Sequence, residues 1–319
     1  MFHSRFLKTA TLTAALTLGT AGLAAAQTVA MGTTKGGATA QVSNALAAVI
    51  SDGSKLMVRP QAMANTSQYL PLVDSGRVEF GIANLPQASF AVKGIAMSEG
   101  HAMPGLEMVA TLIPFNVGLL VPSSLEISDI AGLAGKRVPK FQDGALGDYV
   151  IKAVLSTAGL TYDEVTPVPT ANFPAMFQAI KDGLTDVTIA TVGSQPTYDI
   201  EAAVGGVTYL TFKEGDEAVL DEALPGTVLK TWEGAKEMPG ISAETVTFSY
   251  PYMLFASAEA SDEVVTAAAK ALYDGEAALK SHGPLWAEFD PALMASAQTL
   301  PYHPAAKAFY ESVGVWPAE

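Results

Sequence analysis

The sequence predicts an α/β protein built from two βαβ lobes, with crossing strands at a hinge and a ligand cleft between the lobes. Short apolar runs alternate with amphipathic segments along the chain, a rhythm typical of parallel sheets covered by helices. The chain beyond residue 26 has the length of about two domains. Because no low-complexity linker is present, we expect the two domains to share strands that cross between them.

Residues 1–26 have the three-part composition of a secretory signal peptide. Arg5 and Lys8 precede an Ala/Leu/Thr stretch, which ends in three alanines before Gln27. We therefore expect cleavage after Ala26 and a periplasmic protein, without a lipid anchor because no cysteine lies near the cut. A membrane anchor is the weaker interpretation, since the stretch is short, contains threonines and is followed by no stop-transfer charges.

Composition and charge disfavour several classes of partner and site. Without residues 1–26 the chain has 16 Lys and Arg against 32 Asp and Glu, a net charge of −16. This charge argues against nucleic acid and anionic membrane surfaces as partners. The absence of cysteine excludes thiolate nucleophiles and Cys-ligated zinc.

Lobe one is predicted to comprise residues 27–115 and 250–319. Its first helix is indicated by apolar residues from Val42 to Ile50 that recur at helical spacing. Pro114 separates two apolar runs, which are expected to form a pair of strands. Strands are expected here at residues 28–32, 56–60, 78–83, 106–112 and 115–121, and helices at 42–50, 65–73 and from 265 onwards.

Lobe two is predicted to comprise residues 116–249. The chain is expected to enter it after the strand at 115–121 and to return through an extended apolar segment at 245–257. The other strands are expected at residues 136–138, 187–192 and 207–212, and the helices at 146–157, 173–180 and 196–204.

A glycine-rich turn, GTTKGG at residues 32–37, joins the first strand to the first helix. Glycines let the backbone approach a ligand closely, and N–H groups at a helix start favour an anion. Lys35 adds a positive charge and is expected to be the charge partner of the ligand. An ordinary glycine-rich turn is the alternative, because neither a Walker loop nor GxGxxG is present.

Further turns after predicted strands carry small polar groups in both lobes. Asn65, Thr66 and Ser67 offer amide and hydroxyl groups at a helix start, although they also fit ordinary capping. Strand ends that face a crevice commonly hold ligands. The candidate ligand-binding residues are Thr33, Thr34, Lys35, Gly36, Gly37, Asn65, Thr66, Ser67, Asn84, Gly144, Ala145, Leu146, Gly147, Thr191, Val192, Gly193 and Ser194.

Signatures of catalysis are missing from the sequence. His101, His282 and His303 are too far apart for a local zinc motif such as HExxH. There is no Gly-x-Ser-x-Gly elbow either. We therefore predict no catalytic residue, no metal and no cofactor.

Several segments follow a pattern known from one family. They are the glycine turn, the Asn65–Ser67 segment, SGRVEFGIAN from residue 75, SDIAGLAGKRV from residue 128, AIKDGLTDV from residue 179 and LPYHPAAKAFYESVGV from residue 300. Through them nearly the whole mature chain resembles the TAXI class of solute receptors, soluble components of some tripartite ATP-independent periplasmic (TRAP) transporters. The resemblance implies a type II periplasmic binding protein.

The resemblance also implies a ligand and a partner. The ligand would be a small organic anion, such as a dicarboxylate, an acidic amino acid or a 2-oxo acid like 2-oxoglutarate, and a TRAP permease would receive it. The family's Gly-Gly-Thr-Tyr-Tyr reads GGATA at residues 36–40, so two rings are lost and a small, more acidic ligand is expected. A monomer is expected. A ligand-binding partner of a sensor kinase and a periplasmic enzyme on the same scaffold are the alternatives.

Overall fold

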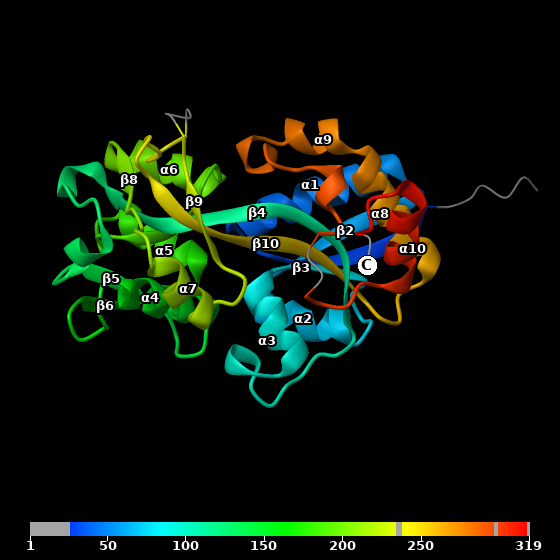
Figure 1. Cartoon of the computed structure of the whole chain (residues 1–319), viewed down its shortest axis with the longest axis horizontal. Helices are drawn as coiled ribbons and strands as arrows, with labels where there is room; N and C mark the ends of the chain where they lie inside the picture. The colour runs from blue at the N-terminus through cyan, green and yellow to red at the C-terminus, as the bar shows by residue number, and fades with distance from the viewer. Residues whose placement is uncertain (1–25, 234–237, 297–298, 318–319) are drawn as a thin grey trace, which may run out of the picture.

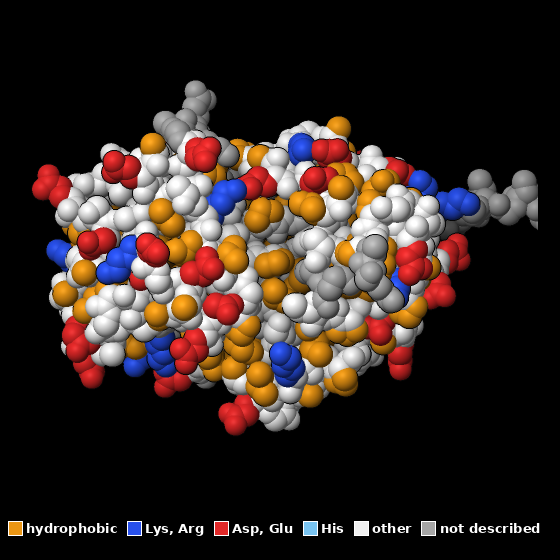
Figure 2. Space-filling view, in the orientation of Figure 1, with side chains coloured by type: hydrophobic (Ala, Val, Ile, Leu, Met, Phe, Trp, Pro, Cys, Tyr) orange, Lys and Arg blue, Asp and Glu red, His pale blue; other side chains and the backbone are white. Residues whose placement is uncertain are grey.

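The computed structural model describes residues 26–233, 238–296 and 299–317 and shows two lobes joined by two long strands (Figure 1). Apart from Ala26, the predicted signal peptide lies outside the described residues. Within the described part of the chain, no helix is both long and apolar enough to span a bilayer. Acidic side chains outnumber basic ones across the face in Figure 2, in keeping with the net charge.

The helices and strands alternate as predicted, although the helices at 85–93 and 216–223 and the strands at 166–169 and 228–231 were not predicted. The strands are β1 Gln27–Thr34, β2 Leu56–Met63, β3 Phe80–Asn84, β4 Leu106–Pro122, β5 Arg137–Lys140, β6 Thr166–Pro169, β7 Thr188–Thr191, β8 Val207–Tyr209, β9 Val228–Thr231 and β10 Val246–Ser257. The α-helices are α1 Gly37–Gly53, α2 Thr66–Asp74, α3 Leu85–Lys93, α4 Leu146–Thr157, α5 Phe173–Lys181, α6 Gln195–Val204, α7 Asp216–Ala223, α8 Asp262–Asp274, α9 Glu276–Ser281 and α10 Pro304–Val313.

The main sheet is mixed and has the strand order β2-β1-β3-β10-β4-β7, with β8 paired to β4 and β9 paired to β10. β1 pairs in parallel with β2 and β3, whereas β10 is antiparallel to β3 and β4. The prediction of parallel sheets was therefore right only for β1, β2 and β3, and for the separate pair β5 and β6. The reason is the return of the chain from lobe two, which inserts β10 in the opposite direction.

β4 is one continuous strand, so the prediction of two strands separated at Pro114 was wrong. Pro114 lies directly opposite Pro251 of β10 in the ladder. Antiparallel pairs alternate between hydrogen-bonded and non-hydrogen-bonded positions, and two prolines, which lack N–H groups, are compatible only with the second kind. The facing prolines therefore cost the ladder no hydrogen bond, and the strand passes through both lobes without a break.

We propose that the lobes meet at the boundaries expected from the sequence, residues 115/116 and 249/250. Phe115 and Tyr250 are paired with each other across β4 and β10, so both crossings lie at one level of the sheet. Lobe one then carries α1–α3 and α8–α10, and lobe two carries α4–α7 (Figure 1).

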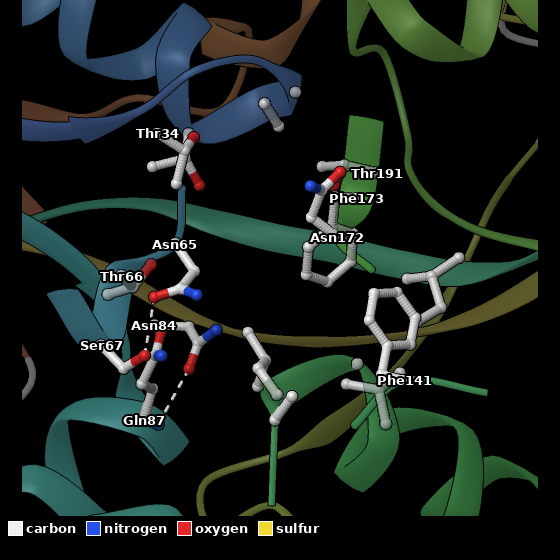
Figure 3. Close-up of a pocket in the computed structure, with 18 of the residues that line it drawn as sticks. Thr34, Asn65, Thr66, Ser67, Asn84, Gln87, Phe141, Asn172, Phe173 and Thr191 are labelled. Carbon is white, nitrogen blue, oxygen red and sulfur yellow. Dashed lines mark hydrogen bonds between the residues drawn. The ribbon is translucent and has the colours of Figure 1, made fainter. Parts of the chain in front are cut away.

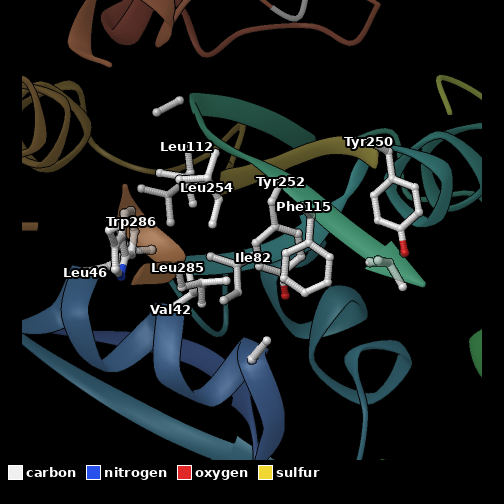
Figure 4. Packing of buried hydrophobic residues seen from close by; sticks show 14 of the residues in the cluster. Val42, Leu46, Ile82, Leu112, Phe115, Tyr250, Tyr252, Leu254, Leu285 and Trp286 are labelled. Atoms are coloured by element: carbon white, nitrogen blue, oxygen red, sulfur yellow. The ribbon is translucent and has the colours of Figure 1, made fainter. Parts of the chain in front are cut away.

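The core of lobe one forms where the apolar face of α1 meets the sheet (Figure 4). Val42, Leu46 and Ile50, spaced one turn apart, are fully buried, as the helical spacing predicted. Trp286, from the segment after α9, is fully buried against the same cluster. The long crossing strands therefore rest on a rigid lobe.

Two of the segments that carried the family resemblance meet in lobe two. Arg137 of the GKRV segment donates four hydrogen bonds to Asp186 of the DGLTD segment, three from its guanidinium group and one from its backbone N–H. Burial opposes ionisation of Asp186, but the bonds from Arg137 outweigh it and hold the pKa of that carboxyl below its usual range. The pair ties β5 to the loop before β7.

We expect Asp186→Asn to destabilise the protein near pH 7 and to have little effect in acid. A carboxyl whose pKa is lowered on folding stabilises the folded state above its unfolded pKa of about 3.9, and that contribution disappears as the pH falls through the folded value. Urea unfolding at pH 7 and below pH 4 measures the difference. Asp163→Asn, at an exposed position of the same lobe, is the control; a penalty independent of pH would contradict the ionic role of Asp186.

The C-terminal His-Pro-Ala-Ala segment attaches α10 to the rest of lobe one. His303 is 2% exposed, and its Nδ1 accepts the backbone N–H of Ala305 at 3.2 Å, which caps α10. Its Nε2 lies 3.2 Å from the carbonyl of Ala260, so the neutral ring protonated at Nε2 satisfies both partners. The Tyr310 hydroxyl donates to the carbonyl of Val109 in β4.

We expect His303→Ala to lower the free energy of unfolding by about 1–2 kcal/mol, because it removes a helix cap and the hydrogen bond to the half-buried carbonyl of Ala260. His303→Asn should recover part of the loss, since asparagine can cap a helix. Thermal or urea unfolding of both variants measures this. Equal losses in the two variants would show that the cap contributes nothing.

Candidate ligand-binding pocket

A cavity of about 170 Å³ lies between the two lobes. Lobe one supplies the turns that lead into α1, α2 and α3, and lobe two supplies β7 and the starts of α4 and α5. β4 and β10 contribute Phe115, Val117, Tyr250 and Tyr252. The pocket therefore lies between the lobes at the crossing strands, where the sequence predicted a cleft.

Five helices begin at the wall of this cavity. α1, α2 and α3 follow directly the carboxyl ends of β1, β2 and β3, where a βα unit places the start of its helix. Their first N–H groups have no partner inside the helix and carry partial positive charge. α1, α2 and α4 lack a side-chain cap at Gly36, Asn65 and Ala145. Their first amides are therefore available to a ligand.

Three asparagines at these helix starts present donors to the cavity (Figure 3). Asn84 Oδ1 accepts the backbone N–H of Gln87 at 2.9 Å, and Asn172 Oδ1 accepts that of Ala175 at 2.9 Å. Because only the oxygen of an amide can accept a backbone N–H, each Nδ2 remains a donor. Asn65 Oδ1 accepts the Ser67 hydroxyl at 2.7 Å in the same way. The three side chains therefore favour a ligand rich in acceptors.

The lining is uncharged: among the described residues that form the cavity wall there is no Lys, Arg, His, Asp or Glu. Burial raises the pKa of the Tyr250 and Tyr252 hydroxyls far above the usual value, so both stay protonated. Tyr252 shares a 2.6 Å hydrogen bond with Thr39 of α1. An acidic ligand would thus meet dipoles and donors rather than a formal countercharge.

The structure brings most of the predicted site residues together. The predicted residues that line the cavity are Thr34, Gly36, Gly37, Asn65, Thr66, Ser67, Asn84, Gly144, Ala145, Leu146, Gly147 and Thr191. They come from both lobes, as expected. Whether they contact a ligand remains a prediction.

Five predicted residues lie outside this wall: Thr33, Lys35, Val192, Gly193 and Ser194. Lys35 is exposed at the turn between β1 and α1. Thr33 is buried on the other face of β1, where its hydroxyl bonds to Ser43 of α1. Ser194 is buried at the start of α6, beside Thr197. The expected charge partner is therefore not part of the wall.

The sequence reasoning missed several residues of the wall. Asn172-Phe173-Pro174 has the signature of a helix start, a capping residue followed by proline, and was identifiable on that ground. Gln87 lies on the first turn of α3, three residues after Asn84. The aromatic residues of β4 and β10 could not be identified as wall residues from the sequence. In a buried strand the residues that face a cavity and those that face the core are both apolar, so no pattern distinguishes them.

Several contacts bridge the two lobes beside the cleft in this structure. The side chain of Gln41 on α1 accepts the backbone N–H of Gln195 on α6 at 3.1 Å. Lys230 of β9 pairs with Glu288 at 2.8 Å, and Asn116 of β4 donates to the same carboxylate. No cluster of three or more potential metal-ligating side chains occurs in the described part of the chain.

Several solved structures share this fold. MatC from Rhodopseudomonas palustris with bound malate is 15% identical, with a TM-score of 0.57 over 91% of this chain and 97% of that one. The periplasmic binding protein BugD is 14% identical, with a TM-score of 0.58 over 91% and 98%. A binding protein component of an ABC phosphonate transporter from Pseudomonas aeruginosa is 9% identical, with a TM-score of 0.53 over 80% and 78%.

These likenesses confirm the predicted α/β fold with two lobes, the architecture of periplasmic binding proteins. No curated protein matches the sequence. The family comparison, in contrast, covers residues 30–314, almost the full length of the chain. The chain therefore belongs to the NMT1-like family.

Proposed function

We propose that this protein is a periplasmic solute-binding protein that captures a small organic anion and presents it to a membrane permease. The observation that carries the proposal is the convergence of uncapped helix starts and asparagine Nδ2 donors on a cavity whose described wall contains no carboxylate. A wall without carboxylates disfavours a cation, and free N–H groups at helix starts favour a negative ligand over a neutral sugar.

The energetics favour binding by many neutral donors. A buried anion without partners is very unfavourable, whereas each hydrogen bond to a charged group contributes about 1.5–3 kcal/mol. The starts of α1 and α2 and the amides of Asn65 and Asn84 can supply several such bonds at one end of the cavity. The donors are fixed by their helices, so little ordering is required when the ligand binds.

Binding would be coupled to closure of the lobes. A ligand that contacts both walls stabilises the closed form, because only that form presents all of the donors. A Cβ built on Gly37 of lobe one would lie 3.5 Å from the Phe177 ring of lobe two, so the two walls are already in close approach. The closed form is then the state that the permease recognises.

For the permease we propose the TRAP type, on the sequence resemblance to TAXI receptors. An ABC-type permease is the second candidate, favoured by the fold shared with a binding protein component of an ABC phosphonate transporter. A sensor kinase in place of a permease, or an enzymatic role on the same scaffold, are further alternatives. A neighbouring gene for a fused multi-span permease supports TRAP transport, and one for a histidine kinase supports sensing.

We expect organic anions to raise the melting temperature of the mature protein, and sugars and metal ions to leave it unchanged. Binding at a hundredfold excess over the dissociation constant stabilises the folded state by about 2.7 kcal/mol. A thermal-shift screen of carboxylates, phosphonates, sulfonates, sugars and divalent cations makes the comparison. A response to sugars or metal ions alone would overturn the proposed function.

We expect Asn84→Asp and Asn172→Asp to weaken anion binding by about thirtyfold or more, since each exchanges a donor for a negative oxygen, a loss of about 2 kcal/mol. Aspartate still caps the helix, so the melting temperature without ligand should hardly change. Calorimetric titration with an anion from the screen gives the affinities. Lys35→Ala is the comparison variant and should cost less than threefold; a larger loss would place Lys35 in the site after all.

A further inference from the structure

The cavity has an aromatic middle that the sequence did not predict. Six aromatic side chains line it, in two groups of three. Phe115, Tyr250 and Tyr252 come from the crossing strands, and Phe115 stacks on Tyr252 with ring centroids 4.3 Å apart (Figure 4).

The second group belongs to lobe two. Phe141 and Phe173 lie 5.2 Å apart, and Phe177 follows one turn later on α5. A Cβ at Gly147 would lie 2.5 Å from the Phe141 ring, so the glycine is what allows this ring to pack against the start of α4. Figure 3 shows Phe141 and Phe173 across the cavity from Asn65, Thr66 and Asn84. The polar groups of lobe one thus face a wall of rings.

The electrostatics of the two ends differ. The first turns of α1, α2 and α3, all in lobe one, contain no acidic residue. The first turn of α4 contains Asp148, which is 1% exposed and accepts hydrogen bonds from Lys152 and Tyr162. This carboxylate already occupies the position near a helix start that favours a negative charge. Asp148 is itself paired with Lys152 at 2.7 Å, so the start of α4 already carries an ion pair. The helix starts at the cavity that lack both a side-chain cap and a carboxylate are those of α1 and α2 in lobe one, which therefore favour one anionic group at that end of the cavity.

The absence of a countercharge from the described wall also favours a ligand with a single negative charge. The described wall has no cationic side chain, so a ligand with two negative groups would have to be stabilised by dipoles and hydrogen bonds alone. The free energy needed to bury the ligand rises steeply with its charge. The volume is also informative. A cavity of about 150 Å³ accepts benzene, so the volume here suits a ligand with one small ring.

We propose that the ligand is an aromatic acid with a single anionic group. Its anionic head lies at the starts of α1 and α2 beside Asn65 and Asn84, and its ring lies between the two groups of aromatic side chains. Stacked and edge-to-face contacts with these rings add about 0.5–1.5 kcal/mol each beyond burial. The proposal rests on the proposed function and narrows it away from dicarboxylates and acidic amino acids.

The test is calorimetric titration of the mature protein with four probes. Benzoate carries the ring and one charge, succinate and glutamate carry two carboxylates without a ring, and benzyl alcohol carries the ring without a charge. We expect benzoate to bind at least tenfold more tightly than each of the others. Phe173→Ala should weaken benzoate binding by about tenfold or more, whereas Phe309→Ala, on α10 away from the cavity, should not change it.

The outcomes separate the two proposals. Tight binding of succinate or glutamate with weak binding of benzoate would overturn the aromatic acid and leave the anion receptor standing. Equal binding of benzyl alcohol and benzoate would overturn the requirement for charge, and with it the anion receptor. An unchanged benzoate affinity in Phe173→Ala, with the protein folded by circular dichroism, would show that the rings of lobe two do not form the site.

Discussion

The pairing of β4 with β10 is the constraint on which the rest of this structure depends. Ten residues of β10, from Phe248 to Ser257, are paired with β4, with register shifts after Tyr252 and Leu254, and the ladder passes through both lobes. A hinge made of two paired strands can bend but cannot slide, because a slip by one residue would turn every side chain to the opposite face. The lobes can therefore open and close while the floor of the cleft keeps its register.

This ladder also explains how the pocket combines two kinds of chemistry. Phe115, Tyr250 and Tyr252 project from neighbouring positions of the crossing strands, so the floor of the cleft is apolar and rigid. The helix starts arrive at the rim of this floor because parallel strands end where their helices begin. The topology therefore gives the pocket an apolar middle bordered by backbone donors. The side chains then determine the shape of the pocket and the positions of its further donors.

The absence of a cationic side chain from the described wall gives the site a particular character. A lysine or arginine binds any anion by charge, whereas oriented amides discriminate by the position and number of acceptors. Neutral donors also avoid leaving an unpaired buried cation when the cleft is empty, which would oppose the closed form. A site of neutral donors therefore suits reversible capture and release of the ligand better than a site with a buried cation.

Local sequence determined the alternation of strands and helices, the glycine turn and most of the polar residues around the cavity, because capping, glycine content and apolar spacing are short-range signals. Asn65, Asn84 and the 144–147 turn were accessible in this way. Tertiary structure alone decided that Lys35 points outward, that Pro114 faces Pro251 within an unbroken strand, and that rings from β4, β10, α5 and the loop before α4 meet. These outcomes depend on register and on contacts between segments that are distant in sequence, for which no local pattern exists.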